Sequence, residues 1–152
     1  MIDLPVGAFR SVLNSQLSRG KVLLTQIVFP EGPLFKRMIL LNNNFSEEDI
    51  YYLLTTSRVG FYVKYGNREP QKGNYIYIIK GGTPINSNEP MIIDCREVYD
   101  IKKEKLVENY KSKMLRYLGD MPEEIMTKID KIISASRLIS QKIKIHIIPN
   151  HT

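Results

Sequence analysis

The sequence predicts a β-rich α+β domain, a small barrel of antiparallel strands with a C-terminal helix and a short N-terminal helix. Between residues 21 and 101, short runs of strand-forming residues alternate with turns that are too short for helical crossovers, which argues against a parallel sheet. After residue 101, apolar residues recur at helical spacing. The length of 152 residues and the 43% hydrophobic content fit one domain, 1–152, with one core.

The strands are predicted from β-branched and aromatic runs and from the turns that bound them. The first run follows a short amphipathic helix over 8–17, and Pro30 and Pro33 stop it because proline cannot donate to a strand ladder. We expect strands over 21–29, 37–41, 49–56, 59–66 (a strand or strand-like loop), 74–80, 91–94 and 97–101, the last two alternatively forming one bent strand.

Helical spacing and capping residues predict the C-terminal third. A short helix is expected over 102–115, ended by Tyr117-Leu118-Gly119. Asp120 is expected to cap a second helix that runs to about Leu138, because its side chain can accept from an amide of the first turn. The apolar stripe of that helix predicts core packing: Ile125, Ile129, Ile132, Ile133 and Ile139. The tail 142–148 alternates as a strand does, and would complete the chain's own sheet or add to the sheet of another chain.

The net charge of +6 favours anionic partners such as nucleic acid, an acidic protein segment or a membrane surface. Residues 1–101 hold 11 Lys and Arg against 10 Asp and Glu, and residues 102–152 hold 11 against 6, so most of the excess lies in the last third. No apolar run is long enough to cross a bilayer, and the N-terminus lacks the order of a signal peptide. We therefore expect a cytoplasmic protein that acts away from the membrane.

Most enzyme signatures are missing from the sequence, including the phosphate-binding glycine loops, the GxSxG and HExxH motifs and paired cysteines. The lone Cys95 predicts a small core residue; a catalytic thiol would need His146 or His151 as its base. The acidic run 47–49 is interpreted as a solvated loop, with a metal site as the alternative. No cofactor and no metal are expected.

Polar residues at strand ends are the remaining candidates for chemistry. Arg37 opens the predicted second strand, and Thr55 and Thr56 close the third. If these strands pair antiparallel, the start of one lies near the end of the other, so Arg37 would approach the threonines at one rim of the barrel. A guanidinium that grips two phosphate oxygens beside hydroxyl donors is one form of phosphodiester site.

Four segments resemble a known family in their order and spacing. They are GKVLLTQIVFPEGPLFKRMILLNN, IYYLLTTSR, IIDCREVYDIKKEKL and LGDMPEEIMTKIDKIISASRLI, and together they span about residues 20–140. Residues 1–19 and 141–152 are extensions. The chain resembles the MazF/PemK ribonuclease toxins of type II toxin–antitoxin systems, which have an SH3-like barrel. Arg37 matches the family arginine and Thr55 its threonine, whereas Met38 and Ser57 depart from the usual proline and glutamine.

The resemblance implies a metal-independent endoribonuclease acting on single-stranded RNA, a homodimer neutralised by an antitoxin protein. Arg37 would stabilise charge on the phosphate, and Thr55, with Thr56 as its neighbour, would orient it. Residues expected to follow the RNA backbone or stack on bases are Lys36, Ser57, Arg58, Tyr62, Lys64 and Arg68. The alternative is a non-catalytic binding module for protein or nucleic acid, including a gyrase-poison-like toxin, because one fold serves many functions.

Overall fold

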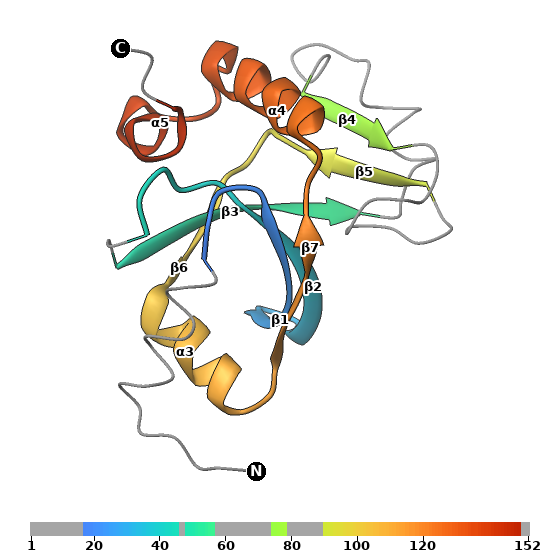
Figure 1. Cartoon of the computed structure of the whole chain (residues 1–152), viewed down its shortest axis with the longest axis vertical. Coiled ribbons are helices and arrows are strands. Elements are labelled where there is room, and N and C mark those ends of the chain that lie inside the picture. The colour runs from blue at the N-terminus through green and yellow to red at the C-terminus, as the bar shows by residue number, and fades with distance from the viewer. Residues whose placement is uncertain (1–16, 46–47, 57–73, 79–89, 150–152) are drawn as a thin grey trace.

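The computed structural model describes residues 17–45, 48–56, 74–78 and 90–149, which form a β-rich α+β protein with a seven-stranded antiparallel sheet and three helices (Figure 1). The predicted helix 8–17, except Leu17, and the predicted strand 59–66 lie outside these residues. The elements are β1 (Lys21–Phe29), β2 (Gly32–Leu40), β3 (Asp49–Thr56), β4 (Tyr75–Ile78), β5 (Met91–Asp94), β6 (Tyr99–Lys102), α3 (Lys103–Lys111), β7 (Leu115–Asp120), α4 (Glu123–Ala135) and α5 (Gln141–Ile147).

The strands are ordered β4-β5-β3-β2-β1-β7, and every pairing is antiparallel. Two strands share one edge of β3: β6 pairs with its first half, at residues 49–52, and β5 with its end, at Thr55 and Thr56. Among the described strands the sheet stays open, with β4 and β7 as its ends. Closure into a barrel therefore remains a prediction.

Both faces of the sheet are covered, each by its own helices. One face, here called the α4 face, carries Val22, Ile39 and Leu53, which pack with buried residues of α4 and α5. The other, the α3 face, carries Leu23, Met38, Leu40, Ile50 and Tyr52, which pack with Leu106 and Val107 of α3. Successive strand residues point to opposite faces, so the run 49–56 can be apolar on both, as predicted.

The second strand begins five residues earlier than the sequence predicted. Pro30 and Glu31 form the turn of a hairpin in which Phe29 pairs with Gly32, whose φ is 127°, and Val28 pairs with Pro33. In a two-residue hairpin the closing pair exchanges both hydrogen bonds and the next pair exchanges none, so proline at position 33 costs no ladder bond. Arg37 therefore lies inside β2 and does not open it.

The segment after Lys111 also differs from the prediction. Helix α3 ends at Lys111, and Lys113, with φ 61°, reverses the chain while the Met114 amide donates to the Asn109 carbonyl at 2.7 Å. Residues 115–120 then form β7, because Gly119, with φ 146°, is accommodated at a β-bulge opposite β1. Asp120 closes that strand and does not cap α4, which starts after Pro122 without a side-chain cap.

The tail predicted as a strand is helix α5. The Ser140 hydroxyl caps it by accepting from the Ile143 amide at 3.3 Å, and Ile143 and Ile147, four residues apart, turn toward the core. Between them, Lys144 is buried and donates to the carbonyls of Ser134 and Ser136, at 3.1 and 2.7 Å, at the C-terminal end of α4. The two strand-addition hypotheses for this tail are therefore wrong.

Arg19 joins the sheet to both C-terminal helices. Its guanidinium donates to the carbonyls of Leu41 and Ile147 and forms an ion pair with Asp130 of α4. Burial lowers the pKa of Arg19, an effect that nearby Glu123 partly offsets.

In the part of the chain that the structure describes, no helix is both long and apolar enough to cross a membrane.

Candidate functional site

The structure brings Arg37 and Thr55 to neighbouring positions of neighbouring strands. Strands β2 and β3 pair antiparallel, and their ladder ends where Met38 lies opposite Leu54. Arg37 and Thr55 are the next residues outward on the two strands, so continuing the register by one position sets them opposite each other. Directly opposite residues of an antiparallel pair have Cβ atoms about 4.5–5.5 Å apart, which is close enough for both side chains to contact one phosphate.

Arg37 and Thr55 also share one face of the sheet. Alternation along β2 places Arg37 on the same face as Ile39, and alternation along β3 places Thr55 on the same face as Leu53. Both Ile39 and Leu53 belong to the core of the α4 face. The guanidinium and the threonine hydroxyl can therefore act on one ligand.

Two other predicted site residues fall on the opposite face. Thr56 follows Thr55 and pairs with Ile92, and Lys36 precedes Arg37 and pairs with Thr25. One step along a strand reverses the direction of the side chain, so Thr56 and Lys36 lie on the α3 face. The structure does not bring them to Arg37. The other predicted RNA-binding residues lie outside the described ranges: Ser57, Arg58, Tyr62, Lys64 and Arg68.

Arg37 carries an unused hydrogen-bond donor. Its Nε atom is buried and has no hydrogen-bond partner among the described residues. A buried donor without a partner costs about 1–3 kcal/mol of folding free energy, and such groups are rare in native proteins. An anion that reached this N–H would satisfy it together with the guanidinium charge, as a phosphate oxygen does when it accepts from arginine.

One cross-strand row connects this pair with the neighbouring strands. Leu24 of β1 lies opposite Arg37 on one side and opposite Arg116 of β7 on the other. Thr55 lies opposite Ile93 of β5. Residues directly opposite each other share a face, so the row on the α4 face reads, from β7 to β5, Arg116, Leu24, Arg37, Thr55 and Ile93. We call it the Arg37 row.

The row is buried at one end and open at the other. Ile93 is fully buried beneath the α4 core, and Thr55 is 9% exposed. Leu24 is half-buried and Arg116 is exposed. Accessible surface therefore extends from Arg37 toward β1 and β7, and the β5 side is closed.

Neither cysteine nor histidine chemistry fits the described residues. Cys95 is buried, as predicted, and burial together with nearby Asp94 raises the pKa of its thiol to about 12, so the thiol stays protonated at neutral pH. His146 stacks on Tyr51 with ring centroids 5.6 Å apart. Tyr51 lies four residues before Thr55, about 13 Å along the strand, so His146 cannot serve as the base at Thr55.

Carboxylates likewise give no metal site in the described ranges. Asp49 of the acidic run opens β3 and accepts from Lys102 Nζ at 2.6 Å, while Glu47 lies outside those ranges. No group of three His, Cys, Asp or Glu side chains that could hold a metal ion occurs among the described residues. Among the described residues, the Arg37 site offers a cation and a hydroxyl.

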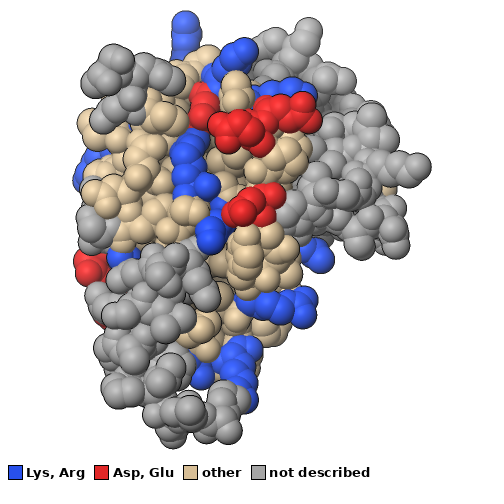
Figure 2. All heavy atoms as spheres, viewed as in Figure 1, with Lys and Arg blue, Asp and Glu red and all other residues tan. Residues whose placement is uncertain are grey.

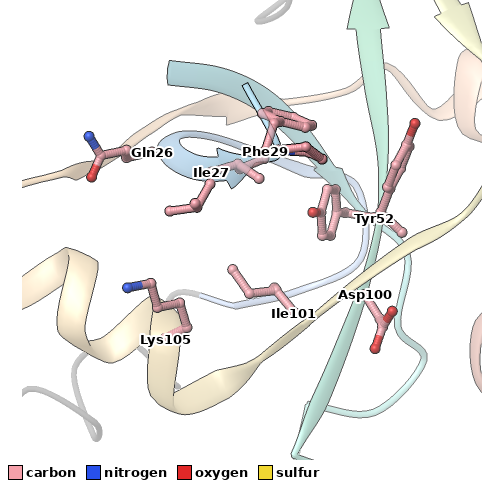
Figure 3. Close-up of a pocket in the computed structure, with 10 residues that line it drawn as sticks. Gln26, Ile27, Phe29, Tyr52, Asp100, Ile101 and Lys105 are labelled. Carbon is pink, nitrogen blue, oxygen red and sulfur yellow. The ribbon is translucent and has the colours of Figure 1, made fainter. Parts of the chain in front are cut away.

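A pocket of about 330 Å³ lies on the α3 face, between the β1–β2 hairpin and α3 (Figure 3). Ile27, Phe29, Tyr52 and Ile101 give it an apolar lining, and Lys105 lies at its edge. Arg37 and Thr55 do not line it.

A second pocket, about 360 Å³, lies between β4 and α4 and is lined by Tyr75, Ile76, Lys128, Lys131 and Ile132. Ile76 of this pocket pairs with the buried Ile93, which lies between the pocket and Thr55.

Basic side chains are spread over one face of the described part of the molecule. Figure 2 shows Lys and Arg in several separate groups on one face, from the α4–α5 end at the top to the α3 end at the bottom, with acidic side chains among them. On this face, the described basic side chains do not gather into one patch.

Arg116 and Phe35 are the surface residues that sequence reasoning missed. Arg116 falls between the helix expected over 102–115 and the break expected at Tyr117-Leu118-Gly119, so the sequence predicts no strand there. Phe35 falls in the loop expected before residue 37, because two prolines precede it.

No model of a known protein family matches the chain, and a search of curated proteins finds no match to it.

Proposed function

We propose that the protein is a toxin of the MazF/PemK type, with an SH3-like barrel, that cleaves single-stranded RNA without a metal ion. The observation that carries this proposal is the pair formed by Arg37 and Thr55, which share one face on adjacent strands. The buried Arg37 Nε, which has no partner among the described residues, supports it because a phosphate oxygen would satisfy that donor.

RNA supplies its own nucleophile in this reaction. The 2′-oxygen attacks the adjacent phosphorus and loses its proton to solvent; the bond from phosphorus to the 5′-oxygen breaks, and that oxygen takes up a proton. The products are a 2′,3′-cyclic phosphate and a free 5′-hydroxyl. Arg37 stabilises the negative charge that develops on the phosphate oxygens, and Thr55 holds the phosphate in line.

The biological partners follow from the same proposal. The toxin acts in the cytoplasm as a homodimer, and an antitoxin protein neutralises it. The net charge of +6 supports an acidic antitoxin as well as RNA.

The test is to incubate the protein with a long defined RNA in EDTA and to map the cut ends. We expect cyclic phosphate on one product and hydroxyl on the other. Arg37→Met should lower the cleavage rate about 100- to 1000-fold, the cost of removing one preorganised donor to transition-state charge. Lys36→Met is the matched control, because it removes the same charge from the adjacent residue on the opposite face and should leave the rate unchanged.

Two results would contradict the proposal. Cleavage by Arg37→Met at the wild-type rate would remove Arg37 from the reaction. Absence of cleavage by the wild-type protein on any long RNA would favour a non-catalytic binding module of the same fold.

A further inference from the structure

We infer that single-stranded RNA leaves Arg37 across β1 toward β7, with Arg116 holding a second phosphate and Phe35 stacking on a base. This inference rests on the proposed function for the identity of the ligand and adds the path that the ligand takes. It begins with the closed end of the Arg37 row. The fully buried Ile93 beyond Thr55 blocks the β5 side, so the strand must continue on the β1 side.

Arg116 stands at the open end of the row. Two strand spacings separate it from Arg37, about 10 Å, with Leu24 between them. Its side chain is exposed and forms no hydrogen bond or ion pair with any other residue in the described part of the chain. Two arginines at this separation on one face can contact two phosphates of the same strand.

Phe35 lies beside these arginines on the same face. It precedes Arg37 by two positions on β2, which keeps it on the α4 face about 7 Å away, and it pairs with the half-buried Gln26. Its side chain is 53% exposed, which is costly for phenylalanine unless a partner covers it. Cationic side chains next to an exposed aromatic ring are the combination that single-strand binding sites use.

The hairpin provides a matched apolar control. Leu34 is 49% exposed, nearly as much as Phe35, but it pairs with Ile27 and therefore lies on the α3 face. Arg137, exposed in the segment between α4 and α5, is the control for charge. A general effect of charge or of surface hydrophobicity changes a variant and its control equally; the proposed path predicts a difference.

The experiment measures binding of a fluorescent, fully 2′-O-methylated RNA, which cannot be cleaved through a 2′-oxygen, over a series of salt concentrations. Arg116→Gln should raise Kd several-fold and reduce the slope of log K against log salt by about 0.7, the loss of one phosphate contact on a single strand. Arg116→Lys should restore the slope, because a lysine retains the charge. Arg137→Gln should leave the slope unchanged.

Phe35→Ala should weaken binding about 5- to 100-fold, the effect of losing one base stack, and Phe35→Tyr should bind as the wild type does. Leu34→Ala should have no effect. With cleavable RNA, Arg116→Gln should raise KM and leave kcat unchanged, because the contact is remote from the scissile phosphate.

The outcomes separate this inference from the proposed function. If the wild-type protein cleaves RNA and Arg116→Gln behaves as Arg137→Gln does, the path is wrong and the ribonuclease proposal survives. If the wild-type protein neither binds nor cleaves RNA, the proposed function itself fails. Should a variant not fold, photocrosslinking of 4-thiouridine RNA to the wild-type protein decides: crosslinks in peptides of β7 and the hairpin support the path, and crosslinks confined to other peptides overturn it.

Discussion

Arg19 and Arg37 both reach the α4 face, but they lie in two different parts of it. Arg19 lies in the part covered by α4 and α5, where it donates to two carbonyls and pairs with Asp130. Arg37 lies where this cover ends, and its Nε has no partner among the described residues. The covered part satisfies its polar groups internally, whereas the Arg37 Nε, although itself buried, has no such internal partner among the described residues.

This difference separates residues that hold the fold together from residues that are available for chemistry. A guanidinium that bridges three segments contributes stability, and its removal leaves an uncompensated carboxylate behind. A guanidinium with an unsatisfied buried N–H reduces stability unless something binds to it. Substitutions in the covered part should therefore change the free energy of unfolding, and substitutions in the open part should change the handling of RNA.

The largest effect on stability is expected at Arg19. Arg19→Met should lower the free energy of unfolding by about 2–3 kcal/mol, below the 3–5 kcal/mol of a fully buried pair, because the Arg19 and Asp130 side chains are 20% and 25% exposed. Arg37→Met should change it by less than about 1 kcal/mol. Urea unfolding followed by circular dichroism measures both. Equal destabilisation by the two variants would contradict the distinction between a structural Arg19 and an Arg37 that does not stabilise the fold.

The second-largest effect is expected at Thr55, and it tests whether a single hydroxyl beside Arg37 takes part in cleavage. Thr55→Val should lower the rate of RNA cleavage about 10- to 100-fold, which corresponds to the loss of one hydrogen bond to a charged group. Thr56→Val, one residue further along on the α3 face, should cleave RNA as the wild type does. The measurement is kcat on one defined RNA, with melting temperatures to verify folding. A larger loss in Thr56→Val would show that the register assigns the wrong threonine.

The smallest expected effect is on the pH dependence of the free energy of unfolding, and it comes from Cys95 in the covered part. Burial raises the pKa of the Cys95 thiol from 9.0 to about 12, so between these values the unfolded chain loses a proton that the folded protein keeps. Stability is therefore complete below pH 9 and falls above it, by up to about 1.4 kcal/mol per pH unit.

Cys95→Ala should flatten this dependence, when urea unfolding is compared at pH 8 and pH 10. The half-buried Tyr99 and buried Tyr52 remain in both proteins, so their ionisation cancels in the comparison. An equal decrease in stability for Cys95→Ala and the wild type would show that this thiol does not contribute.

Sequence reasoning was right where one local signal dominated. Strands 21–29, 49–56 and 91–94 have the predicted bounds, because β-branched and aromatic runs ended at clear turns. The stripe of Ile125, Ile129 and Ile133 is buried in α4, as its spacing predicted.

The errors occurred where a local rule met a tertiary contact. The second strand begins at Gly32 and not at Arg37, because hairpin pairing leaves the nitrogen of Pro33 without a ladder partner. Gly119 does not interrupt regular structure: it lies within β7, where pairing with β1 accommodates it at a β-bulge. The alternating tail is helical, because Lys144 completes the end of α4.

The sequence by itself determined the β-rich class and the antiparallel strands, since short connections are a local property, and it named Arg37 and Thr55 as candidates. Only the tertiary structure decided which threonine and which cations share a face with Arg37. Direction in a strand reverses at every residue, so a register known to one position is needed to tell Thr55 from Thr56. Arg116 comes from a strand 79 residues further along the chain than Arg37, and only pairing through β1 brings the two together.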